Sequence, residues 1–442
     1  MLKIPDNLFC ELVSATSTPQ VSLGSLQIPK EFTSADLTTT LASLTESEPK
    51  PLQGPFRFFV NGKLLQSDLA SHMSKYAIHG EKKIRILFEE GMTVPRIGNR
   101  IEFKDWVREI GCIDDKTSPF TIVGLFSGRL AILDKNMTQL GIVDKGTRPF
   151  HPLTTGPKDE PLDCQLFRFL PHRHSTEASD FMSFSADYHG DLSVFEHSVG
   201  LGTDDWQHRS SLVYTFENQC RVTALSMNPG NQDQLILGDI EGNLKLVQIS
   251  DSGKSEDAQW SLRLNTLVGN DNLTSFKSVN DLKWSSESSI VGLGNDNSVS
   301  LVEPSSLQPI LRINTQFSTP LVCALRENSA KCTLVGFEDG YLRLFDLRSN
   351  QKKAQSLYKS HSQMVSSLDF NKVDGNLFVS GGVDGLVKVW DMRSDRPLYS
   401  VKVAENSKIF CVRWTSKTTF ISGGDDSSVT EHAMHSQELN SN

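Results

Sequence analysis

Residues 361–391, HSQMVSSLDFNKVDGNLFVSGGVDGLVKVWD, decide the fold of this chain. Three strand patterns follow one another here, at 365–370, 377–380 and 386–390, each apolar or alternating and each bounded by turn residues. Asp384-Gly385 supplies the pair that a tight hairpin needs, because glycine accepts a positive φ and aspartate bonds its own backbone. The stretch is therefore predicted to form an antiparallel meander.

Four side chains in this meander can hydrogen-bond to one another: His361, Ser380, Asp384 and Trp390. Their spacing resembles the internal tetrad of a WD-repeat blade, and Trp390-Asp391 is the dipeptide that names the repeat. A His-Asp pair could also act as a proton relay, but within a repeat we interpret it as structural. The tetrad is predicted to stabilise its blade by roughly 1 kcal/mol per hydrogen bond.

The same pattern recurs six more times, so the sequence predicts seven repeats. The later copies are spaced at about 40–50 residues, the usual period of a propeller. Only one copy carries Trp-Asp, so most blades are expected to depend on apolar packing. The predicted fold class is mainly β, a seven-bladed WD-repeat β-propeller preceded by a second, smaller domain. The six further copies end at Asp134, Glu196, Gln248, Glu303, Asp346 and Ala433.

The first 90 or so residues show a different order of elements, that of a ubiquitin-like β-grasp (α+β) domain. Strands are expected at 9–13, 21–26 and 83–88, with a hairpin at 56–65. Ser34 is expected to cap a helix that continues through Leu41, and Ser67 or Asp68 to cap a short helix to about Tyr76. Conjugation to other proteins is disfavoured, since no Gly-Gly terminus follows the sheet.

The predicted domain organisation is a ubiquitin-like (NLE-type) domain at 1–91, a linker at 92–104, the propeller at 105–434 and a polar tail at 435–442. The last repeat ends at Ala433, so its outermost strand is missing from the C-terminal end. We expect residues 92–103 to supply that strand and thereby close the ring.

Composition limits the classes of function. The net charge of −9 and the lack of basic runs disfavour nonspecific nucleic-acid binding over the whole surface. No signal peptide and no long apolar run is found, so a soluble, intracellular protein without a membrane partner is expected. The seven cysteines are scattered and fit reduced thiols. His172, His174, His432 and His435 lack further ligands at metal-binding spacing.

Motifs of catalysis are also lacking in the sequence. Gly292-Leu-Gly294 is not followed by a helix, and no nucleophile elbow, HExxH or kinase set is found. We therefore predict no enzymatic activity, no catalytic residue, no cofactor and no metal site of the chain's own.

The two-domain order resembles the Ytm family of ribosome-biogenesis factors, the WD-repeat subunit of the PeBoW complex. The similarity is clearest at Phe58–Leu65, at Asp105–Val107, from His361 to Tyr399, and at Lys408–Phe410 with Ile421–Gly424. It implies a scaffold for maturation of large-subunit (25S/28S and 5.8S) rRNA and for pre-60S assembly. The implied partners are Pescadillo and the block-of-proliferation WD protein, and the implied location is the nucleus, with nucleolus and nucleoplasm.

In this family the ubiquitin-like domain docks a midasin-type AAA ATPase through a carboxylate that completes the ATPase's magnesium site. Aligning residues 64–73 puts the expected acid at Ala70, which cannot ligate a metal. Asp68 is the nearest carboxylate and could substitute as a donor, or it could simply cap the short helix. Both interpretations stay open on the sequence, as does direct contact with rRNA.

Two other functions remain possible on the sequence. A Notchless-type pre-60S factor also joins a ubiquitin-like domain to a propeller, but that family carries eight repeats. A WD-repeat substrate receptor of a ubiquitin ligase is the third hypothesis, and it predicts binding to a cullin adaptor.

Overall fold

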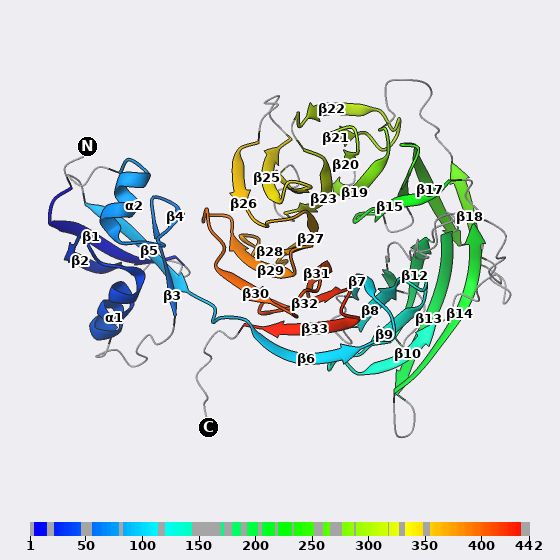
Figure 1. The fold of residues 1–442 in the computed structure, drawn as a ribbon, viewed down its shortest axis with the longest axis horizontal. Coiled ribbons are helices and arrows are strands. Elements are labelled where there is room, and N and C mark those ends of the chain that lie inside the picture. Colours follow the sequence, from blue (N-terminus) through cyan, green and yellow to red (C-terminus); the bar gives the residue numbers. More distant parts are fainter. Residues whose placement is uncertain are drawn as a thin grey trace. The chain divides into compact units, whose positions relative to one another are not determined.

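The computed structural model divides into two compact units (Figure 1). The first contains Met1–Arg96, Asp391–Tyr399 and Ala433–Asn442, and the second contains Ile97–Trp390 and Ser400–His432. The residues that the structure describes are 4–15, 22–45, 55–78, 83–113, 120–143, 169–171, 179–186, 192–201, 206–216, 220–231, 234–251, 260–265, 276–286, 289–316, 318–326, 332–347 and 354–434.

The first unit is built on a five-stranded sheet in the order β2-β1-β5-β3-β4. β1 runs parallel to β5, whereas its pairing with β2 is antiparallel. Two helices accompany the sheet, and side chains from both helices join those of β1 and β3 in one apolar core. The bounds are β1 Asn7–Ser14, β2 Ser22–Pro29, α1 Ser34–Thr45, β3 Phe56–Val60, β4 Lys63–Leu64, α2 Leu69–Lys75 and β5 Ile84–Glu90.

Local sequence explains most of this unit. Asn61 and Gly62 both have positive φ, at 50° and 73°, as the type I′ turn between β3 and β4 requires. The prediction that Ser34 caps α1 is wrong by one residue. Thr33 precedes the helix, its carbonyl accepts the N–H of Leu37, and its own N–H donates to the carboxylate of Asp36 at 2.8 Å.

The second unit contains seven four-stranded sheets among the described residues. In strand order they are β10-β9-β8-β7 (Gln139–Val143, Leu130–Leu133, Phe120–Leu125, Val107–Ile113), β11-β12-β13-β14 (Phe169–Pro171, Ser179–Ala186, Leu192–Leu201, Trp206–Phe216), β15-β16-β17-β18 (Val222–Met227, Gln234–Asp239, Leu244–Asp251, Trp260–Asn265), β19-β20-β21-β22 (Val279–Ser286, Ser289–Gly294, Ser298–Val302, Pro309–Asn314), β23-β24-β25-β26 (Pro320–Leu325, Cys332–Phe337, Tyr341–Asp346, Ser356–Lys359), β27-β28-β29-β30 (Val365–Phe370, Leu377–Gly382, Leu386–Asp391, Tyr399–Lys402) and β31-β32-β33-β6 (Ile409–Trp414, Thr419–Gly424, Ser428–Ala433, Arg96–Glu102).

The meander predicted at 365–391 is confirmed as β27, β28 and β29, with Leu368 opposite Ser380 in the antiparallel register of the first two strands. The sheet that contains the C-terminal strand β33 takes its fourth strand, β6, from residues 96–102. First strands of successive sheets contact one another, from β15 through β19, β23, β27 and β31 to β7 (Figure 1). The chain is therefore mainly β, with few helices and many antiparallel sheets.

Apolar side chains of neighbouring sheets pack together and stabilise the second unit. Val107 and Ile110 of β7, for example, share a core with Cys411 of β31 and Ile421 of β32. Burying side chains of this size stabilises a fold by about 1.5–3 kcal/mol each, so packing outweighs any single polar contact. The six cysteines within the described ranges are free thiols.

Two kinds of feature are absent from the described part of the chain. No helix there is long and apolar enough to cross a membrane. The same residues contain no group of three or more His, Cys, Asp or Glu side chains that could hold a metal ion. His172, His174 and His435 lie outside the described residues.

Candidate functional site

Asp68 lies at the N-terminus of α2 and caps it. Its Oδ1 accepts the backbone N–H of Ser71 at 2.8 Å, and its Oδ2 accepts the hydroxyl of Ser71 at 2.7 Å. These two hydrogen bonds lower the pKa of Asp68, so the carboxylate is charged at neutral pH. Each carboxylate oxygen has a further lone pair, and the side chain is half-buried. The geometry therefore establishes the cap, and the partly exposed carboxylate keeps acceptor capacity beyond it.

Ala70, where the acid was expected, lies in the first turn of α2 and donates its N–H to the carbonyl of Lys30 at 2.8 Å. The N–H of Leu69 likewise donates to the carbonyl of Phe32. Glu31 lies between these two acceptors and is exposed. Sequence reasoning did not single out Glu31, because only the fold brings residues 30–32 beside the start of α2.

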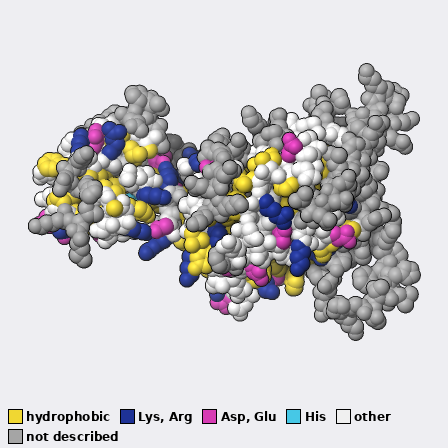
Figure 2. Space-filling view, turned by 90° about the horizontal axis from the view of Figure 1, so that it is seen from above, with side chains coloured by type: hydrophobic (Ala, Val, Ile, Leu, Met, Phe, Trp, Pro, Cys, Tyr) yellow, Lys and Arg dark blue, Asp and Glu magenta, His cyan; other side chains and the backbone are white. Residues whose placement is uncertain are grey.

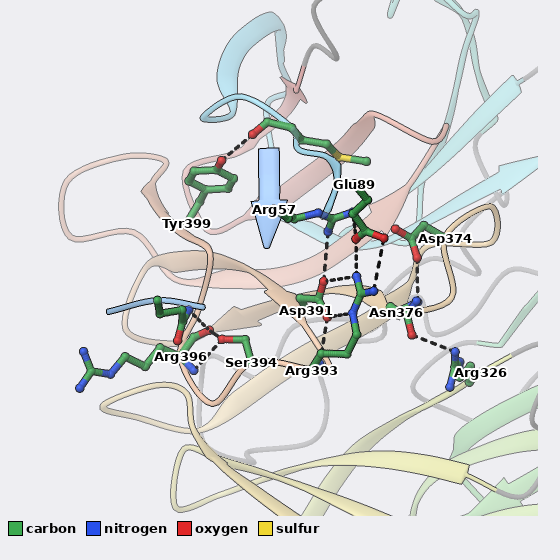
Figure 3. A network of polar contacts seen from close by, with 12 residues as sticks. Arg57, Glu89, Arg326, Asp374, Asn376, Asp391, Arg393, Ser394, Arg396 and Tyr399 are labelled. Atoms are coloured by element: carbon green, nitrogen blue, oxygen red, sulfur yellow. Dashed lines mark hydrogen bonds and ion pairs between the residues drawn. The ribbon is translucent and has the colours of Figure 1, made fainter. Parts of the chain in front are cut away.

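A buried network of charges forms a second feature of the first unit (Figure 3). Arg57 of β3 donates to Asp391 at 3.1 Å and pairs with Glu89 of β5 at 2.9 Å. Arg393 donates to both oxygens of Asp391, at 2.9 and 2.7 Å, and to Glu89 at 2.6 Å. Two cations and two anions therefore neutralise one another. The side chain of Asp391 has no exposed surface.

Further contacts fix this network in the first unit. The guanidinium of Arg393 lies 3.8 Å from the ring centroid of Phe59. The backbone carbonyl of Arg393 accepts the N–H of Leu64. The hydroxyl of Tyr399 donates to the carbonyl of Met92 at 2.5 Å. Burial opposes the charge of Arg393, but its two carboxylate partners outweigh that effect and raise its pKa. Spacing along the chain gave no signal for the pairs Arg57–Asp391 and Glu89–Arg393, whose members are 334 and 304 residues apart.

The four tetrad residues form one chain of hydrogen bonds in the second unit, which a fifth residue, Ser360, extends with its hydroxyl. Ser380 is its centre, since its Oγ lies 2.8 Å from His361 Nε2, accepts the indole N–H of Trp390 at 3.0 Å, and lies 3.2 Å from the Oγ of Ser360. Nδ1 of His361 lies 2.8 Å from Asp384 Oδ1. Burial alone would raise the pKa of Asp384, but the bonds to His361 and to backbone N–H groups lower it to about 2.

Sequence reasoning missed a shorter version of this arrangement in the last sheet. Ser422 lies 2.8 Å from Nε2 of His432, and Phe420 stacks on that imidazole at 4.7 Å. Phe378 likewise stacks on Trp390, at 5.8 Å. A shared Phe-x-Ser motif, followed ten residues after the serine by an aromatic ring, could have identified the equivalence. Burial lowers the pKa of His432 to about 4.

Buried carboxylates on the first strands of two sheets form hydrogen bonds to the first strand of the next sheet. Asp369 of β27 accepts the backbone N–H of Trp414 in β31 at 2.8 Å, and Asp281 of β19 accepts that of Cys323 in β23 at 2.9 Å. Burial raises the pKa of Asp369, against the opposing charge of Arg413. Both carboxylates cross-link strands, and this geometry points to a structural role.

Comparison with protein families gives two matches. Residues 8–73 match the NLE (NUC135) domain, and residues 352–391 match the WD domain, G-beta repeat. The second match ends at the Trp390-Asp391 dipeptide of the tetrad-bearing sheet. The chain is therefore a WD-repeat protein that carries an N-terminal NLE domain.

Curated relatives extend over most of the chain. A protein of Nematostella vectensis named ribosome biogenesis protein WDR12 homolog is 24% identical over 84% of this chain and 86% of its own length. A homolog of the same name from Arabidopsis thaliana is 22% identical over 96% of this chain and 95% of its own. One from Culex quinquefasciatus is 37% identical over 21% of this chain and 22% of its own. The chain belongs to this Ytm/WDR12 family of WD-repeat proteins.

Proposed function

We propose that this chain acts in ribosome biogenesis as a noncatalytic scaffold for the large subunit. Its role is maturation of large-subunit (25S/28S and 5.8S) rRNA and assembly of pre-60S particles, in the nucleolus and nucleoplasm. One observation carries the proposal: relatives that align over 84% and 96% of the chain are named ribosome biogenesis proteins. The NLE and WD matches lie in the order expected for that family.

The proposed architecture is a closed seven-bladed propeller behind a ubiquitin-like domain, with boundaries at 1–91, 92–104, 105–434 and 435–442. Seven four-stranded sheets among the described residues support this count, and the place of β6 beside β33 supports closure. A Notchless-type protein requires eight repeats, so the count favours the Ytm type. A ubiquitin-ligase receptor is supported by no feature of the described residues.

In the proposed complex the propeller binds the block-of-proliferation WD protein and, with it, Pescadillo. The NLE domain docks a midasin-type AAA ATPase. The surface around the start of α2 is where a carboxylate donor has to lie, and Asp68 and Glu31 are the acids there. A hard divalent cation in the ATPase takes oxygen ligands, so one accessible carboxylate is sufficient chemically.

The test of the function uses the tagged full-length protein in its native cells. We expect Pescadillo, the block-of-proliferation protein and precursor large-subunit rRNA to co-purify with it. Depletion is expected to lower mature large-subunit rRNA while leaving small-subunit rRNA less affected. Unchanged levels of both rRNAs after depletion contradict the scaffold function.

Two substitutions separate capping by Asp68 from metal ligation. Asp68→Ser keeps a side chain that caps helices but removes the carboxylate, whereas Asp68→Ala removes both and is expected to cost about 1 kcal/mol of stability. If Asp68 is the donor, both variants lose the ATPase while the other partners remain. If both retain it, Asp68 is only a cap, and Glu31→Gln becomes the decisive variant.

A further inference from the structure

One segment of the first unit comes from far along the chain. Besides residues 1–96 and the end of the chain, this compact unit contains Asp391–Tyr399, which we call the strap. The strap runs from the last residue of β29 to the first residue of β30. Its own polar groups hold it in a turn, since Asp391 Oδ1 accepts the N–H of Arg393 at 2.9 Å and the hydroxyl of Ser394 donates to the carbonyl of Arg396 at 2.6 Å.

Two hydrogen bonds join the strap to the loop that precedes Asp68. The N–H of Leu64, the last residue of β4, donates to the carbonyl of Arg393 at 3.1 Å. The side-chain amide of Gln66, two residues before Asp68, donates to the carbonyl of Arg396 at 3.4 Å. The strap therefore holds the path of the chain from β4 into the cap of α2.

An ion pair joins the strap to the other end of α2. Lys75, the last residue of this helix, pairs with Asp395 of the strap, and the two side chains are 48% and 44% exposed. The preceding repeat carries the same Asp-x-Arg-Ser sequence at 346–349, but Asn350 follows it where Asp395 follows in the strap. The shared residues suit the turn, whereas the added acid is specific to the copy that meets Lys75.

The strap leaves the candidate donors accessible. Glu31 is exposed, and Asp68 is partly exposed while its carboxylate accepts the N–H and the hydroxyl of Ser71. The contacts of the strap lie instead on Gln66 and Lys75, on either side of the cap in sequence. A segment that covers a donor competes with the partner, but one that holds the flanks of the donor orients it.

We propose that the strap positions the start of α2 for docking of the ATPase. This positioning role rests on the proposed docking of a midasin-type ATPase by the NLE domain. A carboxylate must meet a metal ion at a defined distance, so a start of α2 that samples other conformations binds in proportion to its competent fraction. The strap residues are positioning residues, because they act through the loop and the helix that they hold.

The same positioning reaches either candidate donor. The N–H groups of Leu69 and Ala70 donate to the carbonyls of Phe32 and Lys30, so the start of α2 also holds the backbone on both sides of Glu31. A displaced helix therefore moves Asp68 directly and loosens the support of Glu31. The role of the strap does not depend on which of the two acids donates.

The binding experiment uses purified full-length protein and the purified midasin-type ATPase of the same organism, with Mg²⁺ present. Lys75→Glu and Asp395→Lys each place like charges opposite one another, and we expect each to weaken binding about threefold. The double variant restores an ion pair of reversed sign and is expected to bind within about twofold of the native protein. Glu405→Lys, an equal change of charge at an exposed residue of the second unit, is expected to have no effect.

A stronger perturbation acts on the centre of the strap. Arg393→Ala removes its bonds to Asp391 and Glu89 and is expected to weaken binding of the ATPase about tenfold. Arg396→Ala is the matched control, because this exposed side chain points away from the network (Figure 3). Thermal unfolding shows whether each variant is folded at the assay temperature. If Arg393→Ala is not, the exposed Lys75–Asp395 pair still decides the outcome.

Hydrogen exchange of the same full-length proteins measures the strap without the ATPase. Fragments that cover residues 64–76 are expected to exchange faster in Lys75→Glu and in Asp395→Lys, and at the native rate in the double variant. Fragments from β1 are expected to exchange alike in all of these proteins. A strap that only stabilises the whole unit changes both regions together.

Three outcomes overturn the positioning role. They are native affinity in both folded single variants, a double variant as weak as the single ones, and native exchange of residues 64–76 in both single variants. Failure of the proposed docking gives a different result, because the native protein itself then does not bind the ATPase in Mg²⁺. That result overturns the docking and, with it, the positioning role.

Discussion

Ser380→Ala is the most informative perturbation of the second unit, because one hydroxyl serves several buried partners. The change removes a single oxygen and creates little cavity. It leaves the indole N–H of Trp390 and Nε2 of His361 without their partner, 3.0 and 2.8 Å away in the native protein. Trp390 has no exposed surface and His361 is almost fully buried, so water cannot replace the serine.

The expected cost follows from the number of buried groups left unsatisfied. Each costs about 1–3 kcal/mol, so Ser380→Ala is expected to lower the free energy of unfolding by about 2–6 kcal/mol. Ser422→Ala is the matched control, since Ser422 lies within bonding distance of the single partner Nε2 of His432. Its expected cost is about half as large, roughly 1–3 kcal/mol.

Urea-induced unfolding of the full-length variants, followed by far-UV circular dichroism and by tryptophan fluorescence, measures both costs. Coincident transitions from the two probes establish that one free energy describes the unfolding. The reasoning is refuted if Ser380→Ala destabilises no more than Ser422→Ala, or if its cost is below about 1 kcal/mol. Either result means that Ser360 or a water molecule takes over the bonds of the missing hydroxyl.

Two further predictions concern buried charge. Burial lowers the pKa of His432 to about 4, so the imidazole takes up a proton at a higher pH in the unfolded chain than in the folded one. The contribution of neutral His432 to the free energy of unfolding is therefore fully present above about pH 6.5. It falls by roughly 1.4 kcal/mol per pH unit as the pH decreases toward 4. Urea midpoints measured from pH 7 to 4 are expected to fall less steeply in His432→Gln, and equal slopes contradict this origin. Arg393→Ala leaves the buried Asp391 with Arg57 as its remaining cation in the network. The variant is expected to lower the free energy of unfolding of the first unit by about 3 kcal/mol. Arg396 is exposed, so Arg396→Ala is expected to change that free energy by no more than about 0.5 kcal/mol. Similar thermal unfolding of these two variants argues against a stabilising network.

Much of the local structure could be predicted from sequence because its causes are local. Asn61-Gly62 and Asp384-Gly385 allow the backbone conformations of tight turns, and alternation of apolar residues places strands between them. The cap of α1 was misplaced by one residue because serine and threonine stand side by side there, and Asp36 decides between them by bonding the N–H of Thr33.

The candidate site was predicted only in part. The tetrad could be read from spacing because its four members lie within one meander of about thirty residues. The contact between the rings of Trp106 and Phe410 could not be predicted from spacing, since these residues are separated by some three hundred residues and are brought together only when β7 packs beside β31. Likewise, the exposed carboxylate of Glu31 becomes relevant only because its backbone neighbours bond to the start of α2.

The sequence is sufficient for the turns, the strand pattern of the 361–391 meander and the residues of the tetrad, because each depends on neighbours within one hairpin or one repeat. Tertiary structure alone decided which charges neutralise one another. Arg57 and Glu89 are about three hundred residues from Asp391 and Arg393 in sequence, and each charge would be costly to bury without the others. Which remote charges pair depends on how whole strands and loops pack together. A local pattern in the sequence does not contain the distance between two such charges in the folded chain.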